Sequence, residues 1–314
     1  MIEGAKPLDI AAKGVHRAAF ACGNFDGLHL GHRQLLSHLI SLARFSQAAP
    51  AVLSFFPHPR AVLCGEPLPP LASPTQKRRL LAEIGIEVLM EVPFVDEVAR
   101  LSPEEFAFTY FAQPLLGVTD ICVGRNWAFG RGRSGNADSL RALPLGFRVH
   151  EAEEFCLDGA PVSSSRIRCA LGKGDFGLAA RLLGRPWEIE GRVVRGAGIA
   201  SSKLQFPTAN LDCGVPLLPI AGVYAVRAFL APGEASRPGL LNVGSAPTFP
   251  GKEAAPHQAE LHLLDFSGDL YGRQISVLPV AHLRDERRFG SADELKAQIL
   301  LDAAAARQIL SRRG

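Results

Sequence analysis

The first half of the chain alternates short apolar runs with stretches of helical periodicity. The runs at 17–22 and 50–56 have the length and composition of buried strands. Between them, Leu35, Leu36 and Leu39 recur at the spacing of a helix face. Strands that alternate with helices predict an α/β fold with a mostly parallel, doubly wound, Rossmann-like sheet. In such a sheet the ligand crevice lies at the carboxyl ends of the strands.

Further elements continue this alternation. The stretch 75–85 predicts a helix, and the run 87–94 after it predicts a strand. Ser102 and Glu105 have the spacing of a capping box, so a helix is expected to begin directly after Ser102. The run 119–124 predicts the next strand of the same sheet.

The second half changes to strand-like runs separated by glycine and proline, and helical periodicity returns only near the C-terminus. There Ser291 and Glu294 have capping-box spacing and open a predicted terminal helix. Several strands and one helix predict a small antiparallel β-barrel with a terminal helix packed on it. Because a helical stretch ends at "LLGRPWE", we expect two domains, residues 1–184 and 185–314.

Composition narrows the function. A chain of 314 residues with 47% hydrophobic content suffices for two ordinary cores. The net charge of +3, from 34 basic and 31 acidic residues, gives no broad footprint for nucleic acid or a membrane, although local basic sites still allow anionic small molecules. The cysteines are scattered without a Cys-x-x-Cys pair, which favours buried reduced thiols over disulfides or a zinc site. They are Cys22, Cys64, Cys122, Cys156, Cys169 and Cys213.

The N-terminal stretch lacks the basic and apolar regions of a secretion signal, and no apolar run approaches the ~20 residues that span a bilayer. We therefore expect a cytoplasmic protein, monomeric or weakly homo-oligomeric, that binds small molecules and neither nucleic acid nor membrane.

The stretch "GNFDGLHLGH" at 23–32 follows the first predicted strand directly. Gly23 and Gly27 allow a tight turn and a close approach of the backbone to a ligand. The helix start that follows offers free N–H groups and a dipole to a phosphate. His29 and His32, three residues apart, can aim imidazole donors at the same anion. The pattern favours phosphoryl or nucleotidyl transfer, in which the protein positions the reactants and stabilises charge.

Two other interpretations of this turn remain open on the residues alone. A Gly-Asp turn with two surface histidines would be purely structural. A two-histidine metal site would need a third ligand, and the sequence does not point to one.

Several motifs together resemble one known family. The chain is similar, over nearly its whole length, to the bacterial bifunctional riboflavin kinase/FAD synthetase family. The stretch 23–32 resembles that family's Gly-x-Phe-Asp-Gly-x-His-x-Gly-His signature, and further motifs follow in the family's order. They are "FFPHPR" (55–60), "VGRNWAFGRGRSG" (123–135), "VSSSRIR" (162–168), "FPTAN" (206–210), "NVGSAPTF" (242–249), and "ELHLLDF" with "GDLYG" (260–272).

The resemblance implies that the first domain is a nucleotidyltransferase. It would transfer AMP from ATP to FMN, giving FAD and pyrophosphate. His29 and His32 would stabilise charge on the ATP phosphates. The nucleotide pocket would be lined by Gly23, Asn24, Phe25 and Asp26.

Two further motifs would complete this site. Ser164 and Arg168 match the phosphate-handling end of "VSSSRIR", although alone they also fit a helix N-cap with a surface arginine. The flavin would lie against Asn126, Trp127 and Phe129, for which a buried aromatic cluster without a ligand is the alternative. His58 falls in the family's Pro-His-Pro stretch, and its role stays open.

The second domain, by the same resemblance, would phosphorylate riboflavin to FMN with ATP and Mg²⁺. Thr208 and Asn210 offer the hydroxyl and amide oxygens that Mg²⁺ uses. Glu260 is the candidate general base for the ribityl 5′-hydroxyl. In its alternating strand Glu260 shares a face with His262 and opposes Leu261, so an ordinary exposed glutamate is the alternative.

Departures from the family pattern fall mainly in the kinase half. The glycine-rich stretch before "FPTAN" is "GAGIASSKLQ" at 196–205, with Gln205 where a glycine is usual and Lys203 as a possible compensating charge. Ala246 and Ala128 stand where family members often carry a basic residue. These changes leave the adenylyl-transfer motif intact and bear on kinase efficiency.

Three functions are therefore compared. The first is the bifunctional enzyme, with ATP, riboflavin, FMN and FAD as substrates and products. The second is a monofunctional FMN adenylyltransferase with a kinase-impaired, flavin-binding barrel, which the altered 196–205 stretch keeps open. The third is a flavin-responsive protein without turnover, which the presence of both His29 and His32 disfavours, since binding alone needs no donors aimed at a transition state.

Overall fold

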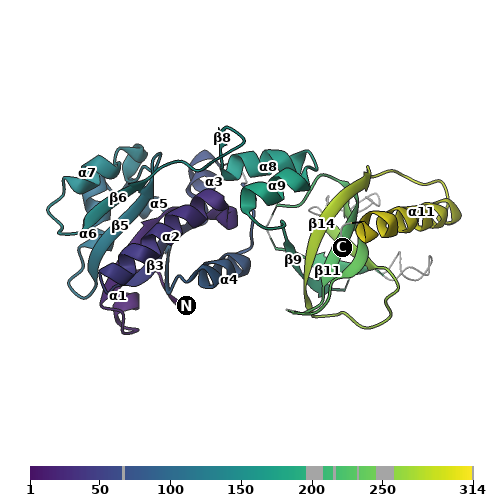
Figure 1. The fold of residues 1–314 in the computed structure, drawn as a ribbon, viewed down its shortest axis with the longest axis horizontal. Coiled ribbons are helices and arrows are strands. Elements are labelled where there is room, and N and C mark those ends of the chain that lie inside the picture. The colour runs from purple at the N-terminus through teal and green to yellow at the C-terminus, as the bar shows by residue number, and fades with distance from the viewer. Residues whose placement is uncertain (66–67, 196–207, 215–216, 232, 245–257, 313–314) are drawn as a thin grey trace. The chain divides into compact units, whose positions relative to one another are not determined.

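The computed structural model describes residues 1–65, 68–195, 208–214, 217–231, 233–244 and 258–312 (Figure 1). By compactness the chain divides into two units. The first comprises Met1–Pro69 and Pro74–Ser164, and the second comprises Pro70–Ser73 and Ser165–Gly314. Compactness thus groups residues 165–184 with the second unit, while the expected functional boundary at residue 184 stays a prediction.

The first unit is built on a six-stranded sheet in which all described pairings are parallel. The strand order is β1-β4-β3-β2-β5-β6. The chain leaves β2 toward β3 on one side and later returns to β5 on the other, so the sheet has a switch point at β2. The strands are β1 Ile2–Gly4, β2 Arg17–Cys22, β3 Ala49–Phe56, β4 Val88–Pro93, β5 Gly117–Gly124 and β6 Arg148–Ala152.

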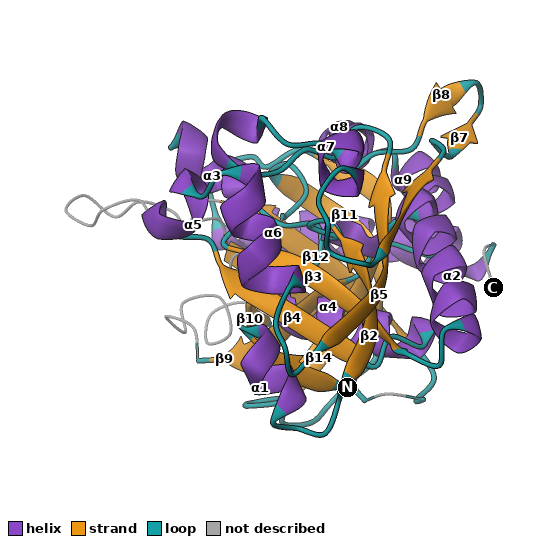
Figure 2. Cartoon of the chain, turned by 90° about the vertical axis from the view of Figure 1, so that its left-hand side faces the viewer, coloured by secondary structure: helices purple, strands orange, loops and turns teal. Residues whose placement is uncertain are grey.

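Helices cover both faces of this sheet (Figure 2). Helices α2 (Leu30–Phe45) and α4 (Pro74–Ile84) bury leucines such as Leu36 and Leu81 on one face. The other face packs against α1, α6 and α7. Those helices are α1 Pro7–Ala11, α6 Pro103–Phe111 and α7 Ala137–Arg141, and shorter elements are η1 Asp26–Leu28, α3 Pro59–Cys64, α5 Asp96–Arg100, η2 Arg131–Arg133, β7 Cys156–Leu157 and β8 Ala160–Pro161.

The predicted doubly wound sheet is confirmed. The four predicted strands correspond to β2, β3, β4 and β5. The capping box is present as expected, since the Ser102 hydroxyl accepts from Glu105 N–H and the Glu105 carboxylate accepts from Ser102 N–H. Edge strand β1 was not predicted, because three residues are too few for a periodic signal.

The second unit contains an antiparallel barrel, as the sequence predicted. The barrel is closed and has six strands in the order β10-β13-β12-β11-β14-β9. Its strands are β9 Ile189–Val194, β10 Ala209–Asp212, β11 Gly222–Phe229, β12 Arg237–Gly244, β13 Gln258–Leu263 and β14 Gln274–Arg284, and its helices include α9 Phe176–Leu183 and α11 Ala292–Ser311. Strand β10 was not predicted from "FPTAN". It is too short to show an alternating pattern.

Helix α11 packs on the outside of the barrel, where Ala306 and Leu310 meet residues of β11 and β12. The Ser291 hydroxyl accepts from Glu294 N–H, as predicted. The Glu294 carboxylate, however, accepts from Gly290 N–H instead of completing the box at Ser291.

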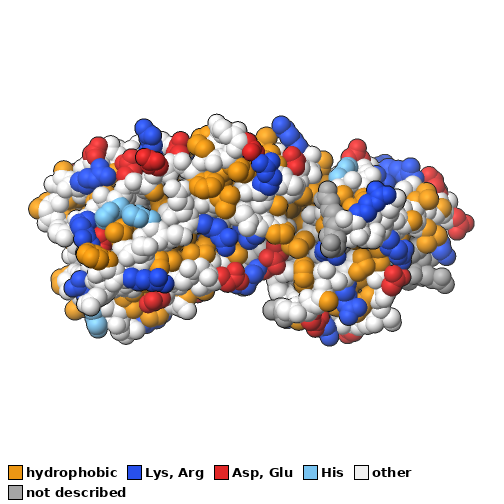
Figure 3. All heavy atoms as spheres, in the orientation of Figure 1, with side chains coloured by type: hydrophobic (Ala, Val, Ile, Leu, Met, Phe, Trp, Pro, Cys, Tyr) orange, Lys and Arg blue, Asp and Glu red, His pale blue; other side chains and the backbone are white. Residues whose placement is uncertain are grey.

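Within the described part of the chain, none of the helices combines the length and apolarity that crossing a bilayer requires. On the face drawn in Figure 3, basic and acidic side chains are interspersed, in keeping with the nearly balanced composition.

Candidate active sites

The turn after β2 lies at the carboxyl edge of the parallel sheet, at its switch point. Gly23 N–H donates to the Leu53 carbonyl of β3 at 3.1 Å, which anchors the start of the turn. Phe25 (φ 51°), Gly27 (φ 76°) and Leu28 (φ 42°) then adopt left-handed backbone conformations. Such conformations are costly for residues with a Cβ and persist where the surrounding structure holds them, often at functional sites. The predicted tight turn is therefore present, and Gly27 is the glycine whose φ requires it.

His29 is the N-cap of α2. Its Nδ1 accepts the backbone N–H of His32 at 3.3 Å. The two imidazole rings are stacked, with centroids 3.6 Å apart and 16° between their planes. Since Nδ1 of His29 is an acceptor, the neutral ring carries its proton on Nε2. The expected juxtaposition of the two histidines is confirmed, and it arises because one caps the helix that holds the other.

His32 packs against two aromatic neighbours, Phe25 and His29. Its ring lies 5.2 Å from that of Phe25. Its Nδ1 is buried and has no hydrogen-bond partner among the described residues. Burial, together with the nearby His29 and the charge of Lys77, holds the pKa of His32 well below its ordinary value. The ring is therefore neutral at physiological pH.

Asn24 is tied to two neighbouring segments. Its side-chain Nδ2 lies 3.0 Å from Nε2 of His58, and its carbonyl accepts from the Ser54 hydroxyl at 3.3 Å. Its Oδ1 is buried and finds no partner in the described part of the chain. His58, whose role the sequence left open, also caps α3 by accepting from Arg60 N–H. It thus lies beside the turn, which the family motif alone did not indicate.

Ser164 begins helix α8 (Ser164–Gly172) and lies against the same turn, because its hydroxyl donates to the Asp26 carbonyl at 3.0 Å. The structure thus brings together His29, His32, Asn24 and Ser164 from separate segments. Arg168, four residues further along α8, belongs to the part of the helix that groups with the second unit.

The three predicted flavin residues lie on the loop after β5, which neighbours β2 in the sheet. The rings of Trp127 and Phe129 are stacked at 4.5 Å. Phe129 is buried and packs against Phe106 of α6, whereas Trp127 is only partly buried. The exposed Asn126 donates to the Glu154 carboxylate at 2.6 Å. Phe129 therefore supports the loop from the core, and Trp127 and Asn126 remain accessible.

In the barrel, Glu260 of β13 pairs in register with Asn210 of β10 on one side and with Asn242 of β12 on the other. Residues directly opposite each other across strands point to the same face. The predicted alternation is confirmed, since Leu261 is buried inside the barrel while Glu260 is half-buried on the other face. Burial raises the pKa of Glu260. Asn242 was not singled out from the sequence; its register position identifies it.

This row of side chains suits a hard cation. Asn210 and Glu260 of this row offer amide and carboxylate oxygens, and Thr208, directly before β10, offers a hydroxyl; this is the donor chemistry that Mg²⁺ prefers. The described residues hold no group of three or more His, Cys, Asp or Glu side chains placed to bind a metal. The alternative of a two-histidine metal site therefore finds no third ligand among them.

The altered stretch 196–205 and Ala246 lie outside the described residues.

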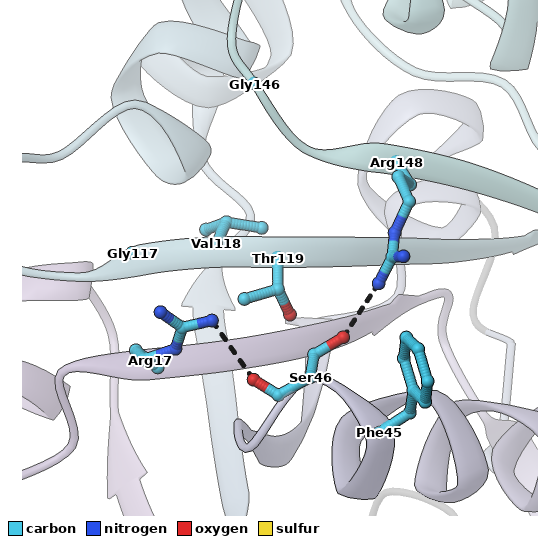
Figure 4. A pocket seen from close by; sticks show the side chains of 8 residues that line it. All are labelled: Arg17, Phe45, Ser46, Gly117, Val118, Thr119, Gly146 and Arg148. Atoms are coloured by element: carbon cyan, nitrogen blue, oxygen red, sulfur yellow. Dashed lines mark hydrogen bonds between the residues drawn. The ribbon is translucent and has the colours of Figure 1, made fainter.

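A second polar cluster lies at the amino edge of the parallel sheet, opposite the turn. Asp120 of β5 is fully buried and accepts from Arg148 twice, at 2.9 and 3.0 Å, and from Ser46 at 2.8 Å. Nε2 of His150 lies 2.8 Å from the same carboxylate. An open pocket of about 480 Å³ lies beside this cluster, lined in part by Arg17, Ser46 and Arg148 (Figure 4).

Both units have a fold and a polar site suited to phosphate-group transfer, which places the chain among two-domain phosphotransferases. Comparison with family models supports each half separately. Residues 12–166 match the FAD synthetase family, and residues 183–310 match the riboflavin kinase family.

The chain belongs to the family of bifunctional riboflavin kinase/FMN adenylyltransferases, because relatives with that name match nearly all of it. The protein of Escherichia coli K12 is 38% identical over 91% of this chain and 90% of its own length. That of Pseudomonas fluorescens is 38% identical over 94% of both chains. A crystal structure of a macrolide-efflux protein from Streptococcus pneumoniae also matches, with a TM-score of 0.79, 28% identity and 98% of each chain covered. This last similarity concerns the fold, and no efflux activity follows for this chain.

Proposed function

We propose that the chain converts riboflavin to FMN in its barrel and FMN to FAD at the turn of its parallel sheet. The observation that carries the second assignment is the stacked pair of His29 and His32 on a left-handed turn whose buried polar atoms lack partners in the described structure. The register of Glu260 with Asn210 supports the first. The family to which the chain belongs supports both.

In adenylyl transfer, a phosphate oxygen of FMN forms a bond to the α-phosphorus of ATP, and the bond to the departing pyrophosphate breaks. Negative charge shifts onto the pyrophosphate oxygens in the transition state. The Nε2–H of His29 and the N–H groups at the start of α2 donate to the phosphate oxygens. His32, neutral and stacked on His29, adds a second donor without placing two positive charges together. Preorganised donors of this kind stabilise developing charge without reorganising during the step.

The remaining residues of this site bind and orient. Gly23, Asn24, Phe25 and Asp26 line the nucleotide pocket. The unpartnered Oδ1 of Asn24 suits a donor group of the nucleotide. Ser164 fixes the turn through the Asp26 carbonyl. Arg168, whose guanidinium has the planar donors that phosphate oxygens accept, groups with the second unit and stays a candidate from the family motif alone.

The flavin of FMN is received on the neighbouring loop. The exposed side of Trp127 and the amide of Asn126 offer a stacking surface and a polar contact to the ring. The buried ring of Phe129 stacks on Trp127 and holds the indole in place.

In riboflavin phosphorylation, Glu260 takes the proton of the ribityl 5′-hydroxyl as that oxygen attacks the γ-phosphorus of ATP, and ADP leaves. The raised pKa of Glu260 makes its carboxylate a better base than an exposed glutamate. Thr208 and Asn210 would hold Mg²⁺, which supplies charge neutralisation to the phosphates of ATP. Asn242, on the other side of Glu260, orients the carboxylate.

The monofunctional alternative is not favoured, because both halves of the chain match their own family model and the full-length relatives carry the bifunctional name. The cytoplasmic location, the monomeric or weakly oligomeric state and the lack of a nucleic-acid partner stay predictions.

The direct test supplies purified protein with Mg-ATP and either riboflavin or FMN, and resolves the flavins by chromatography. We expect FMN and then FAD from riboflavin, and FAD from FMN. FAD from FMN without any FMN from riboflavin would leave only the monofunctional enzyme.

Glu260→Gln sharpens the kinase assignment. It removes the base and keeps the shape, so FMN formation should fall on the order of 100-fold or more while FAD formation from FMN is retained. The control is Glu234→Gln, an exposed glutamate of the same unit, which should leave both rates unchanged. An equal loss of FMN formation in both variants would contradict the role of Glu260.

A further inference from the structure

A buried amine lies beside the adenylyl-transfer turn. Lys77 is on α4, and its side chain is only 12% exposed. Its Nζ donates to the hydroxyl of Ser54, near the carboxyl end of β3. It also lies 3.5 Å from the carboxylate of Glu91 on β4. Lys77 lies outside the sequence motifs that this chain shares with the family.

The hydrogen bonds continue from Lys77 into the turn. The Ser54 hydroxyl, which is fully buried, accepts from Lys77 and donates to the carbonyl of Asn24. A cation thus acts on the backbone of the nucleotide turn through one side chain. A hydroxyl that both accepts from a cation and donates to a carbonyl is polarised, which strengthens the second bond.

Electrostatics connect the same amine to two other residues of the turn. Burial lowers the pKa of Lys77, while the carboxylates of Glu91 and Asp26 oppose that shift. In turn, the charge of Lys77 adds to burial and to His29 in lowering the pKa of His32. The ammonium of Lys77 therefore interacts electrostatically with both Asp26 and His32.

Ion pairing alone does not require a lysine at this position. Arg78, the next residue, already pairs with Glu91 at 3.5 Å and with Glu3 at 3.2 Å. Removing an ammonium from water is costly, and an apolar residue in its place would suit the buried leucines of α4. The interactions of Lys77 with the turn explain why a buried ammonium is present here despite its desolvation cost.

We propose that Lys77 is a positioning residue for adenylyl transfer, whose ammonium fixes the Asn24–Asp26 turn through Ser54 and places a positive charge beside His32. The charge offsets Asp26 and disfavours protonation of His32, so His32 stays a neutral donor. The inference rests on the proposed ATP site at this turn.

The test compares Lys77→Met, Lys77→Arg and Arg79→Met in the full chain, with riboflavin phosphorylation as an internal control. Arg79 lies on the same helix in an exposed pair with Glu83 and serves as the matched control. For Lys77→Met, kcat/KM for ATP in FAD formation should fall about 10- to 100-fold, the loss typical of a hydrogen bond to a charged group. Lys77→Arg should recover part of it, and the rate of FMN formation should stay unchanged in all three.

A second readout is independent of activity. The titratable groups that act on His32 are His29 and Lys77, and Asp26 acts on Lys77 in turn. Removing the lysine removes a positive charge, so the pKa of His32 measured by NMR titration should rise in Lys77→Met and stay unchanged in Arg79→Met. If Lys77 had only a structural role, the pKa of His32 would not rise specifically in Lys77→Met.

Three outcomes overturn the proposal. The first is wild-type FAD formation in Lys77→Met. The second is an unshifted His32 titration in the folded variant. The third is loss of both activities with a lowered melting temperature, which would make Lys77 a structural residue. His29→Ala is assayed alongside; if that variant forms FAD normally, the proposed ATP site fails and not only the role of Lys77.

Discussion

The two edges of the parallel sheet carry polar clusters of opposite character. At the amino edge, Asp120 is buried with its oxygens shared among Arg148, Ser46 and His150. At the carboxyl edge, Asn24 Oδ1 and His32 Nδ1 are buried without partners in the described structure, and the backbone is left-handed. The first cluster makes its hydrogen bonds among its own side chains, whereas the second leaves two buried polar atoms without a partner among the described residues.

The pKa values express the same difference. Burial tends to raise the pKa of Asp120, but hydrogen bonds from Arg148, Ser46 and His150 outweigh it and hold the pKa at about 2. The carboxylate is thereby locked in its charged form. His32 has no such partner for its charged form, and its pKa falls instead. Burial of a polar group alone therefore does not mark a function, and an unpartnered buried polar atom is the feature that calls for an explanation.

The largest expected effect is the loss of FAD formation when the two histidines at the carboxyl edge are replaced. In the double variant His29→Ala/His32→Ala, FAD formation should fall on the order of 1,000-fold, since one preorganised donor alone is worth 100-fold or more. FMN formation should change little, and the melting temperature should fall by only a few degrees, because His29 also caps α2. Steady-state assays of both activities, with calorimetry on the same preparation, check this. A variant that forms FAD at the wild-type rate would remove the histidines from the mechanism.

The reverse pattern is expected at the amino edge. Asp120→Asn keeps the size of the side chain but turns a donor toward Arg148 and His150, which should cost about 3 kcal/mol of unfolding free energy. FAD formation per folded molecule should be unchanged. Denaturant titration gives the first quantity and an active-fraction assay the second. Equal stability in wild type and variant would show that the cluster is not structural.

The pH dependence should separate the two edges as well. Because the folded pKa of Asp120 lies below its ordinary value near 3.9, its ionisation stabilises the fold by about 2 kcal/mol above pH ~4 and loses that contribution as the pH falls toward 2. The stability gap between wild type and Asp120→Asn should therefore narrow to about half by pH 3. Unfolding midpoints at pH 7, 5 and 3 measure it. If the stability difference between wild type and Asp120→Asn instead grows as the pH falls, the role assigned to the Asp120 carboxylate is wrong.

The smallest effects come from a matched pair of serines. Ser46→Ala, at the amino edge, removes a hydrogen bond to Asp120 and should cost about 1 kcal/mol of stability with no change in KM for ATP. Ser54→Ala, at the carboxyl edge, removes the link to Asn24 and should raise KM for ATP about 5-fold. If Ser46→Ala and Ser54→Ala change stability and KM for ATP equally, the proposed difference between a structural and a functional edge is wrong.

The sequence predicted what depends on local pattern. The turn at 23–32, the helix after it and the alternation around Glu260 all follow from spacing within one segment, and the structure bears them out. The parallel sheet and the antiparallel barrel followed from the succession of element types, whereas the order of the strands in each came only from the structure. The resemblance to a family supplied the chemistry.

What the sequence did not reveal is contributed by other segments. His58, Ser54 and Lys77 come from three elements that meet the turn only once the sheet is assembled. Lys77 did carry a signal, since it precedes Leu80 and Leu81 by three and four residues and so lies on the buried face of its helix. Asn242 likewise needs the register between β12 and β13, which no single segment specifies.

The central claim is that two separate sets of residues carry two reactions in one chain. It is tested by mixing His29→Ala and Glu260→Gln, each folded and each assayed alone with riboflavin and Mg-ATP. His29→Ala alone should accumulate FMN, Glu260→Gln alone should make almost none, and the mixture should form FAD because FMN released by one chain is used by the other. FAD from His29→Ala alone, or no FAD from the mixture, would contradict the account.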